Sequence, residues 1–225
     1  MDETRYKERA DKVYLLLAAL FITALVSCNL IANKFVEIDL GFKTFVVSAG
    51  ILPYPLTFLV TDLLSEVYGQ RKASLVVWSG LLASIFVLFV LWLGHLFPAI
   101  PNSPVGNEAY DQVFQNSWKV ILSSMLAYLS AQLVDVKLYH FWKNLTKGRH
   151  LWIRNNFSTL LSQFVDTVLV VGILFLGSKS YTELSSLVFD GWLFKALTAL
   201  LDTLPMYAAT YALKRYLGLS KHEEV

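Results

Sequence analysis

The stretch FSTLLSQFVDTVLVVGILFLG, residues 157–177, decides the fold class because it is long and apolar enough to cross a lipid bilayer as a helix. It nevertheless contains Gln163 and Asp166 in its interior. The same tetrad of Gln, two apolar residues and Asp occurs 31 residues earlier, in SAQLVDVKLY, as Gln132 and Asp135. Because a carboxylate in hydrocarbon is costly, its repetition in the same local pattern indicates a function rather than a lapse in hydrophobicity.

The composition of the whole chain indicates a membrane protein with several spans. Of its 225 residues 56% are hydrophobic, and the mean hydropathy of +0.52 is more apolar than a soluble domain needs. We expect an all-α polytopic membrane protein in which residues 1–225 form a single six-helix transmembrane domain. Apolar stretches of roughly 20 residues, enough to cross about 30 Å of hydrocarbon, predict spans at 13–33, 44–68, 74–97, 118–142, 156–177 and 191–213.

The basic residues predict how the chain is oriented, because short loops rich in Lys and Arg stay in the cytoplasm. With both termini inside, 14 of the 19 Lys and Arg residues fall on or near the cytoplasmic side. We therefore expect both termini in the cytoplasm and the protein in a bacterial-type plasma (inner) membrane. Topology also explains the basic loop KNLTKGRHLWIR, so no nucleic-acid partner is expected. The single cysteine, Cys28, excludes an intrachain disulfide bond.

Polar side chains inside the predicted spans are the candidates for chemistry. An acidic residue at the centre of a spanning helix costs about 2.5–3.5 kcal/mol on insertion scales, so such groups normally face a cavity or a partner. Spacing places Asp62 with Glu66, and each Gln with its Asp, on one helix face. We expect four helices to offer polar faces to a common interior, with these candidates: Asn29, Asp62, Glu66, Gln132, Asp135, Gln163, Asp166, Lys195 and Asp202.

Structural roles compete with functional ones at several of these positions. For Glu66 and Lys137, a place near the cytoplasmic interface is the favoured interpretation, with the charged end reaching toward water. The sequence allows three structural roles for Lys195: its charged end could reach outward to water, pair with Asp202 at i+7, or serve as a counter-charge for Asp62. We regard Asp62 as the proton-sensitive group. By contrast, Gln163 and Asp166 stand about 10 and 15 Å into their helix, where the functional interpretation is favoured.

Backbone signals add two further expectations. The PYP of GILPYPLTFLVTD predicts that the second span breaks and restarts near Pro53, and Pro205 raises the same question in the last span. The polar loop at 98–117 could be either a lid or a connector with a short helical piece from Glu108 to Phe114.

No metalloprotease, hydrolase or nucleotide-binding motif is present, so no enzyme, metal or cofactor is expected. An intramembrane protease using Asp166 and Asp202 is the least favoured alternative.

Four segments resemble the queuosine precursor transporters, within the vitamin uptake transporter group. These segments are TDLLSEVYG at 61–69, AYLSAQLVDV at 127–136, LSQFVDTV at 161–168, and the Lys195 to Pro205 spacing. The resemblance implies import of 7-deazaguanines, namely 7-cyano-7-deazaguanine, 7-aminomethyl-7-deazaguanine or queuine, for tRNA modification. It also implies a fold similar to the six-helix substrate-binding subunits of ECF vitamin importers.

The implied ligand could form hydrogen bonds with the Asp and Gln side chains inside the predicted spans. A guanine-like edge offers adjacent N–H groups that a carboxylate can accept, while a Gln amide can donate to the neighbouring carbonyl. Aromatic side chains such as Tyr128 could stack on the flat ring. The predicted substrate-binding residues are Asn29, Asp62, Gln132, Asp135, Gln163, Asp166 and Lys195, followed by Glu66, Asp202, Tyr54, Tyr68 and Phe164.

Two modes of transport remain open at this stage. A carrier completes the cycle alone, whereas a binding subunit needs an ATPase and a scaffold protein. ECF binding subunits typically carry a small-residue motif such as AxxxA on the first helix. Here LLLAALFITALVS spaces Ala18 with Ile22 and Ala19 with Thr23, neither a clean match, which favours independent transport. Whether the protein forms a homodimer is left open.

Overall fold

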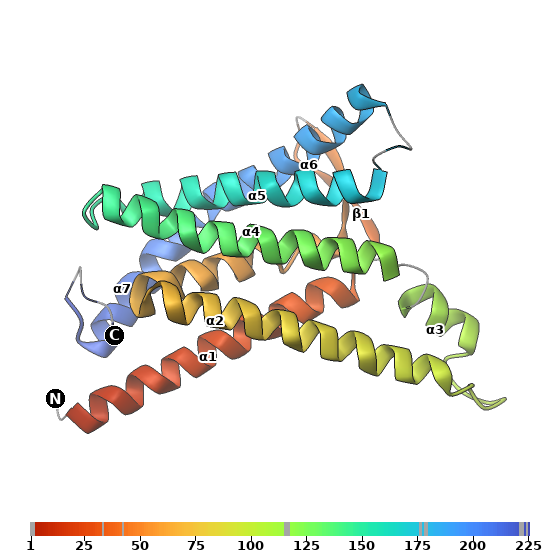
Figure 1. Ribbon diagram of the computed structural model, residues 1–225, viewed down its shortest axis with the longest axis horizontal. Coiled ribbons are helices and arrows are strands. Elements are labelled where there is room, and N and C mark those ends of the chain that lie inside the picture. The colour runs from red at the N-terminus through yellow and green to blue at the C-terminus, as the bar shows by residue number, and fades with distance from the viewer. Residues whose placement is uncertain are drawn as a thin grey trace.

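Helices dominate the computed structural model, which describes residues 3–32, 34–41, 43–114, 118–175, 177, 180–220, 223 and 225. Both termini lie at one end of the bundle, which we name the termini end; the opposite end, the hairpin end, carries a two-stranded sheet and α3 (Figure 1). The elements are α1 (Glu3–Leu30), β1 (Phe35–Asp39), β2 (Thr44–Ser48), the 3-10 helix η1 (Ala49–Ile51), α2 (Tyr54–Leu96), α3 (Asn107–Phe114), α4 (Trp118–Leu145), α5 (Leu151–Phe175), α6 (Tyr181–Leu201) and α7 (Thr203–Leu217).

Helix α2 contains two helical segments that run in opposite directions. Gly69 lies between them with φ +80° and ψ 172°, a backbone conformation that side-chain-bearing residues rarely adopt. The chain reverses there, so that segment 54–68 approaches the termini end and segment 70–96 returns toward α3 (Figure 1). The helix begins directly after Pro53, which confirms the restart expected from the PYP sequence. A proline in the first helical turn costs nothing because its missing N–H has no helical acceptor there.

The first part of the predicted span 44–68 is wrong. Residues 44–48 are the strand β2, which pairs antiparallel with β1 from Phe35↔Ser48 to Asp39↔Thr44. The sequences FVEID and TFVVS are rich in the β-branched and aromatic residues that favour strands, and Gly41 between them has φ +82°. An apolar strand has the same hydropathy as the beginning of an apolar helix, so hydropathy alone predicts a helix here.

Other span boundaries also differ from those expected. Helix α1 ends at Leu30 rather than at residue 33, and α6 begins at Tyr181, ten residues before the predicted 191. The early start has a physical reason, since Ser180 and Glu183 form a reciprocal capping box. The last predicted span breaks at Asp202, and α7 carries Pro205 in its first turn. Helix α3 confirms the short helical piece expected in the 98–117 loop, whose residues 115–117 lie outside the described part.

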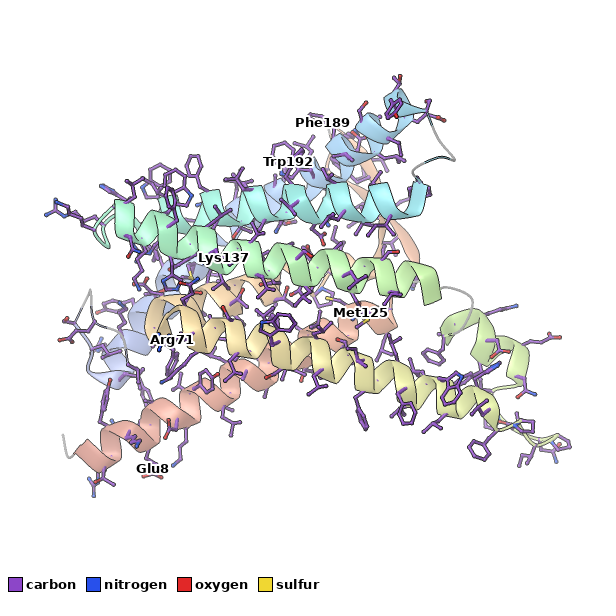
Figure 2. All side chains as sticks on the ribbon, in the orientation of Figure 1. Glu8, Arg71, Met125, Lys137, Phe189 and Trp192 are labelled. Carbon is purple, nitrogen blue, oxygen red and sulfur yellow. The ribbon has the colours of Figure 1, made fainter. Side chains whose placement is uncertain are left out.

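The bundle is apolar outside and polar inside. Large apolar side chains such as Leu82 and Phe86 are 70% and 64% exposed, and Phe189 and Trp192 project from α6 (Figure 2). Four helical segments among the described residues are long and apolar enough to cross a membrane: Thr4–Leu30, Ala49–Leu96, Leu151–Ile173 and Tyr181–Leu201. Exposed apolar surface of this extent is what a hydrocarbon environment requires.

Candidate functional site

A cavity of about 330 Å³ lies at the hairpin end of the bundle, and we name it the outer cavity. Its walls come from α1, β2, η1, the start of α2, α4, α5 and α6. The polar residues that line it are Asn29, Ser48, Tyr54, Ser124, Tyr128, Asp166, Thr167 and Lys195. The volume lies within the range of about 300–1,000 Å³ found for small-molecule pockets. The outer cavity is therefore large enough for one compact ligand.

Asp166 is the charged centre of the outer cavity. Its Oδ2 atom accepts a 2.9 Å hydrogen bond from the Tyr54 hydroxyl and forms an ion pair with the Lys195 ammonium. The Lys195 Nζ also stands 4.8 Å from the centroid of the Tyr54 ring, a cation–π arrangement. These contacts join α2, α5 and α6 at one carboxylate oxygen. Consequently the Asp166 side chain is fixed in position by two neighbouring helices.

Two buried polar atoms of cavity-lining residues lack a hydrogen-bond partner among the described residues. They are the Oδ1 acceptor of Asp166 and the Nδ2 donor of Asn29. Gln163, one turn from Asp166 on α5, is 1% exposed and likewise has an Oε1 atom without a partner. Leaving a buried polar group unsatisfied costs about 1–3 kcal/mol, so such groups point to a ligand. A carboxylate oxygen and an amide N–H offer one acceptor and one donor to it.

The hairpin covers the outer cavity through specific contacts. Lys43 forms a 2.5 Å ion pair with Asp190 of α6, and the rings of Phe45 and Phe194 lie 5.2 Å apart. Ser48 Oγ donates to the Ala32 carbonyl at 2.6 Å, which fixes β2 against the end of α1. The Lys43–Asp190 pair is partly exposed, so the attachment to α6 is weaker than core packing.

A second polar layer lies deeper, between segment 54–68, α4 and α5. Gln132 accepts a 3.0 Å hydrogen bond from the Thr61 hydroxyl and donates to the Tyr128 hydroxyl at 2.8 Å. Asp135 Oδ1 accepts from Ser162 Oγ at 2.9 Å. Asp135 faces Asp62, because α4 contacts segment 54–68 on either side of it, through Gln132 and through Tyr139. This layer does not line the outer cavity, except through Tyr128.

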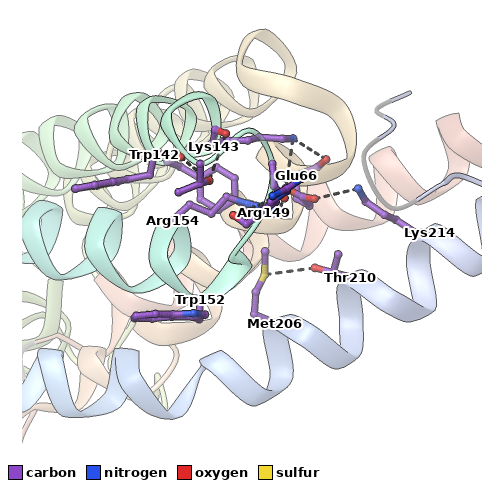
Figure 3. Close-up of polar contacts among 12 residues, drawn as sticks. Glu66, Trp142, Lys143, Arg149, Trp152, Arg154, Met206, Thr210 and Lys214 are labelled. Carbon is purple, nitrogen blue, oxygen red and sulfur yellow. Dashed lines mark hydrogen bonds and ion pairs between the residues drawn. The ribbon is translucent and has the colours of Figure 1, made fainter.

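The third layer, at the termini end, is an ionic cluster around Glu66, shown in Figure 3. Its carboxylate contacts Lys214 at 3.0 Å, Arg154 at 2.8 Å and Lys143 at 3.3 Å, and Tyr139 donates to it at 3.1 Å. We name these residues the inner cluster. They come from segment 54–68, α4, α5 and α7, so the cluster ties four parts of the bundle together. A second cavity of about 480 Å³ opens beside Glu66, Arg154 and Lys214.

Comparison with known proteins decides the family. The family profile described as "Putative vitamin uptake transporter" matches residues 48–209. The chain belongs to this transporter family. A curated relative, the "Probable queuosine precursor transporter" of Bacillus subtilis (strain 168), is 31% identical over 188 residues, which cover 83% of this chain and 80% of that protein. No solved structure matches. The resemblance drawn from the sequence motifs is therefore confirmed, and the protein is a membrane transporter.

The transporter's geometry separates the predicted site residues into groups. Asn29, Tyr54, Asp166 and Lys195 line the outer cavity, and Gln163 lies one turn deeper. Gln132, Asp62 and Asp135 lie in the second layer, away from the cavity. The Gln132 amide donates to the Tyr128 hydroxyl at 2.8 Å and so orients a residue that lines the cavity.

The sequence-based interpretation of Glu66 is wrong. Glu66 is 2% exposed and does not reach toward the interface, because three cations hold it inside the inner cluster. Lys195 pairs with Asp166, and not with Asp202 or Asp62. Asp202 marks the break between α6 and α7, outside the cavity lining.

Two of the predicted aromatic residues also lie away from the cavity. Phe164 is 46% exposed on the outside of the bundle and packs against Trp192 at 6.0 Å between ring centroids. Tyr68 is buried and donates its hydroxyl to the Ala10 carbonyl of α1 at 2.7 Å. Lys137 is exposed on α4, as the structural interpretation predicted.

The basic residues of the inner cluster were missed as a group by sequence reasoning. Arg154 stands two residues before the predicted span 156–177, and Lys143 one residue after the span 118–142. Both were counted toward topology, since positive residues at span ends commonly report orientation. The available signal was Glu66 itself, because a buried acid in a membrane helix needs a cationic partner.

Proposed function

We propose that this transporter imports a 7-deazaguanine precursor of queuosine, captured from outside the cell in the outer cavity. The candidates are 7-cyano-7-deazaguanine, 7-aminomethyl-7-deazaguanine and queuine. The observation that carries the proposal is that one small cavity is lined by two residues with unsatisfied polar atoms, Asp166 Oδ1 and Asn29 Nδ2. Similarity to a protein named as a queuosine precursor transporter supports the same substrate class.

The polar atoms of the cavity complement a guanine-like edge. Asp166 Oδ1 would accept from the ring N–H and exocyclic amino group, and Asn29 Nδ2 would donate to the adjacent carbonyl oxygen. Tyr54 and Tyr128, whose ring centroids lie 5.5 Å apart, supply aromatic surface for the flat bicyclic ring. Gln163 Oε1 offers a further acceptor one turn deeper. Lys195 would act indirectly, by holding the Asp166 carboxylate in its orientation.

We further propose a transport conformation that is consistent with the contacts at the two ends. We place the termini end in the cytoplasm of a bacterial cell, with the hairpin end outside and six passes of the inner membrane between them. The inner cluster would then close the cytoplasmic end while the outer cavity is accessible beneath the hairpin. Alternating access requires a closed end opposite the loaded site. Rupture of the Glu66 contacts would release substrate toward the cavity beside Lys214.

Uptake in cells that cannot synthesise queuosine tests the substrate. The chain is expressed in such cells, each of the three precursors is supplied, and tRNA modification is measured. We expect at least one precursor to restore modification with the wild-type protein and with Asp111→Asn, a surface variant on α3. Asp166→Asn should reach the membrane but fail to restore it. Wild-type protein present in the membrane without any restoration would overturn the proposal.

Reconstitution in liposomes distinguishes an independent transporter from a substrate-binding subunit. We propose that the chain transports alone, so purified protein in liposomes should exchange external for internal 7-cyano-7-deazaguanine. Exchange needs no energy source, and it therefore reports the translocation step itself. Binding without exchange would favour a subunit that depends on an ATPase and a scaffold protein. An intramembrane protease remains the least favoured alternative, because Asp166 is committed to Lys195 and Asp202 lies outside the outer cavity.

A further inference from the structure

The contact between Asp62 and Asp135 has no role in the substrate site described above. These residues are 1% and 0% exposed, and they come from segment 54–68 and α4. The contacts on either side of them, Thr61 with Gln132 at 3.0 Å and Glu66 with Tyr139 at 3.1 Å, place the two carboxyl groups next to each other. Neither residue lines the outer cavity, and neither forms an ion pair within the described part of the chain. Two acids are thus placed against each other in the interior of a membrane protein.

The hydrogen bonding of the pair is incomplete without a proton. Ser162 donates to Asp135 Oδ1, but Asp62 Oδ1 and Asp135 Oδ2 receive no hydrogen bond from any described group. An ionised carboxylate only accepts hydrogen bonds, so two ionised carboxylates in contact repel each other and cannot bond. One proton on the pair supplies the missing donor and removes one of the two negative charges. Ser65, one turn from Asp62, has a buried hydroxyl that is also unsatisfied.

The charges that face the pair favour this singly protonated state. From α5 the pair meets Arg154 together with the neutral Ser158, Thr159 and Ser162. Arg154 contacts Glu66 at 2.8 Å and is therefore shared with another acid. Asp62 also interacts with Tyr139 of α4 and with Asp202 at the junction of α6 and α7.

The inner cluster supplies a compensating field of limited strength. It combines Glu66 with Lys143, Arg154 and Lys214, one negative and three positive groups. This excess of positive charge stabilises the one negative charge that a singly protonated pair carries. A second negative charge would compete with Glu66 for Arg154, the cation that acts most strongly on Asp62.

The position of the pair suits a coupling role. Along segment 54–68, Asp62 lies about 12 Å beyond Tyr54 of the outer cavity and about 6 Å before Glu66 at 1.5 Å per residue. The pair therefore stands between the substrate cavity and the closed cytoplasmic end. We propose that Asp62 and Asp135 form a proton-binding site, and that its proton is carried inward with the substrate. The coupling half of this proposal rests on the proposed import function, whereas the proton site itself does not.

Release of the proton is a simple ionisation of the Asp62–Asp135 pair. The carboxylic O–H bond of the pair breaks, the proton leaves to water at the termini end, and the pair keeps two negative charges. The doubly charged pair then competes with Glu66 for the Arg154 guanidinium. Loss of the 2.8 Å contact between Arg154 and Glu66 would loosen the inner cluster and open the cytoplasmic end. Proton release and substrate release are coupled in this way.

Infrared spectroscopy of the purified protein tests the proton site without any substrate. A protonated carboxyl group gives a C=O stretching band that a carboxylate lacks. At neutral pH we expect this band in wild type and in Asp166→Asn, the matched change at an acid that is paired with Lys195. Asp62→Asn and Asp135→Asn should each lose it, since the remaining carboxylate can accept from the new amide. A band that is absent from wild type, that persists in both variants, or that disappears when Na⁺ replaces K⁺ overturns the proton site.

Liposomes that contain the purified protein test the coupling. With the membrane potential clamped, an inward proton gradient should drive accumulation of 7-cyano-7-deazaguanine by up to about tenfold per pH unit for one proton per substrate. Lys137→Gln, on the exposed side of α4, is the control and should accumulate equally. Substrate exchange without pH-driven accumulation overturns the coupling and leaves the import function intact. Absence of exchange overturns the import function and, with it, the coupling, while the infrared result still decides the proton site.

Discussion

Replacement of Asp166 by Asn tests the centre of the proposed substrate site. In the wild-type protein Oδ2 receives the Tyr54 hydroxyl and the Lys195 ammonium, whereas Oδ1 is free to accept from the ligand. In Asp166→Asn an amide N–H group faces either the ligand's N–H groups or Lys195, so one acceptor is lost in either orientation. The change is nearly isosteric and therefore leaves the cavity volume intact.

The expected magnitude follows from the loss of a charged acceptor. A hydrogen bond to a charged group contributes about 1.5–3 kcal/mol, and about 1.4 kcal/mol corresponds to a tenfold change in affinity. Asp166→Asn should therefore weaken binding of 7-cyano-7-deazaguanine by about 10- to 150-fold. The stability cost should stay below the about 3–5 kcal/mol of breaking a buried pair, because the Lys195 side chain is 15% exposed at the cavity.

Isothermal titration of the purified protein in detergent gives the Kd, and thermal unfolding of the same samples reports stability. Asp111→Asn on α3, which contacts His95 at the surface, is the control for a change from Asp to Asn. An unchanged Kd in a folded Asp166→Asn protein would refute the assignment of this carboxylate to the ligand. A collapsed unfolding transition would instead identify the Lys195 pair as mainly structural.

Three further predictions concern other parts of the molecule. Tyr54→Phe removes a donor to the central carboxylate and should weaken binding by about tenfold, since about 1.5 kcal/mol is lost; an unchanged Kd would contradict this. Glu66→Gln leaves three cations without their acid and should cost about 3–5 kcal/mol, so its melting temperature should fall well below that of Lys137→Gln. Gly191→Val should block binding, because Gly191 lines the outer cavity. Even a Cβ atom there would meet the Thr167 side chain of α5 at 3.2 Å, so the larger Val side chain has to occupy cavity space. Gly172→Val, where a Cβ meets nothing within 4 Å, should bind normally.

Much of the architecture follows from local patterns. Helical periodicity and length depend on neighbouring residues alone, so the chain from 54 onward shows helices at or near most predicted spans. The break before Pro53 and the short α3 are likewise local, because they arise from proline geometry and turn-forming residues. The hairpin was missed because an apolar strand and an apolar helix start have the same hydropathy. Their difference lay in the β-branched residues on either side of Gly41.

The sequence by itself determined which side chains are costly in a membrane, and hence that Asp62, Asp135 and Asp166 need partners. It did not determine those partners, because the spacing of residues along one helix fixes a shared face but not the rotation or depth of the helix packed against it. The antiparallel packing of α4 on α5 brings Asp135 to Ser162 and leaves Asp166 to the cation of α6. The tertiary structure alone therefore decided that two Gln–Asp pairs with the same spacing lie in different layers of the transporter.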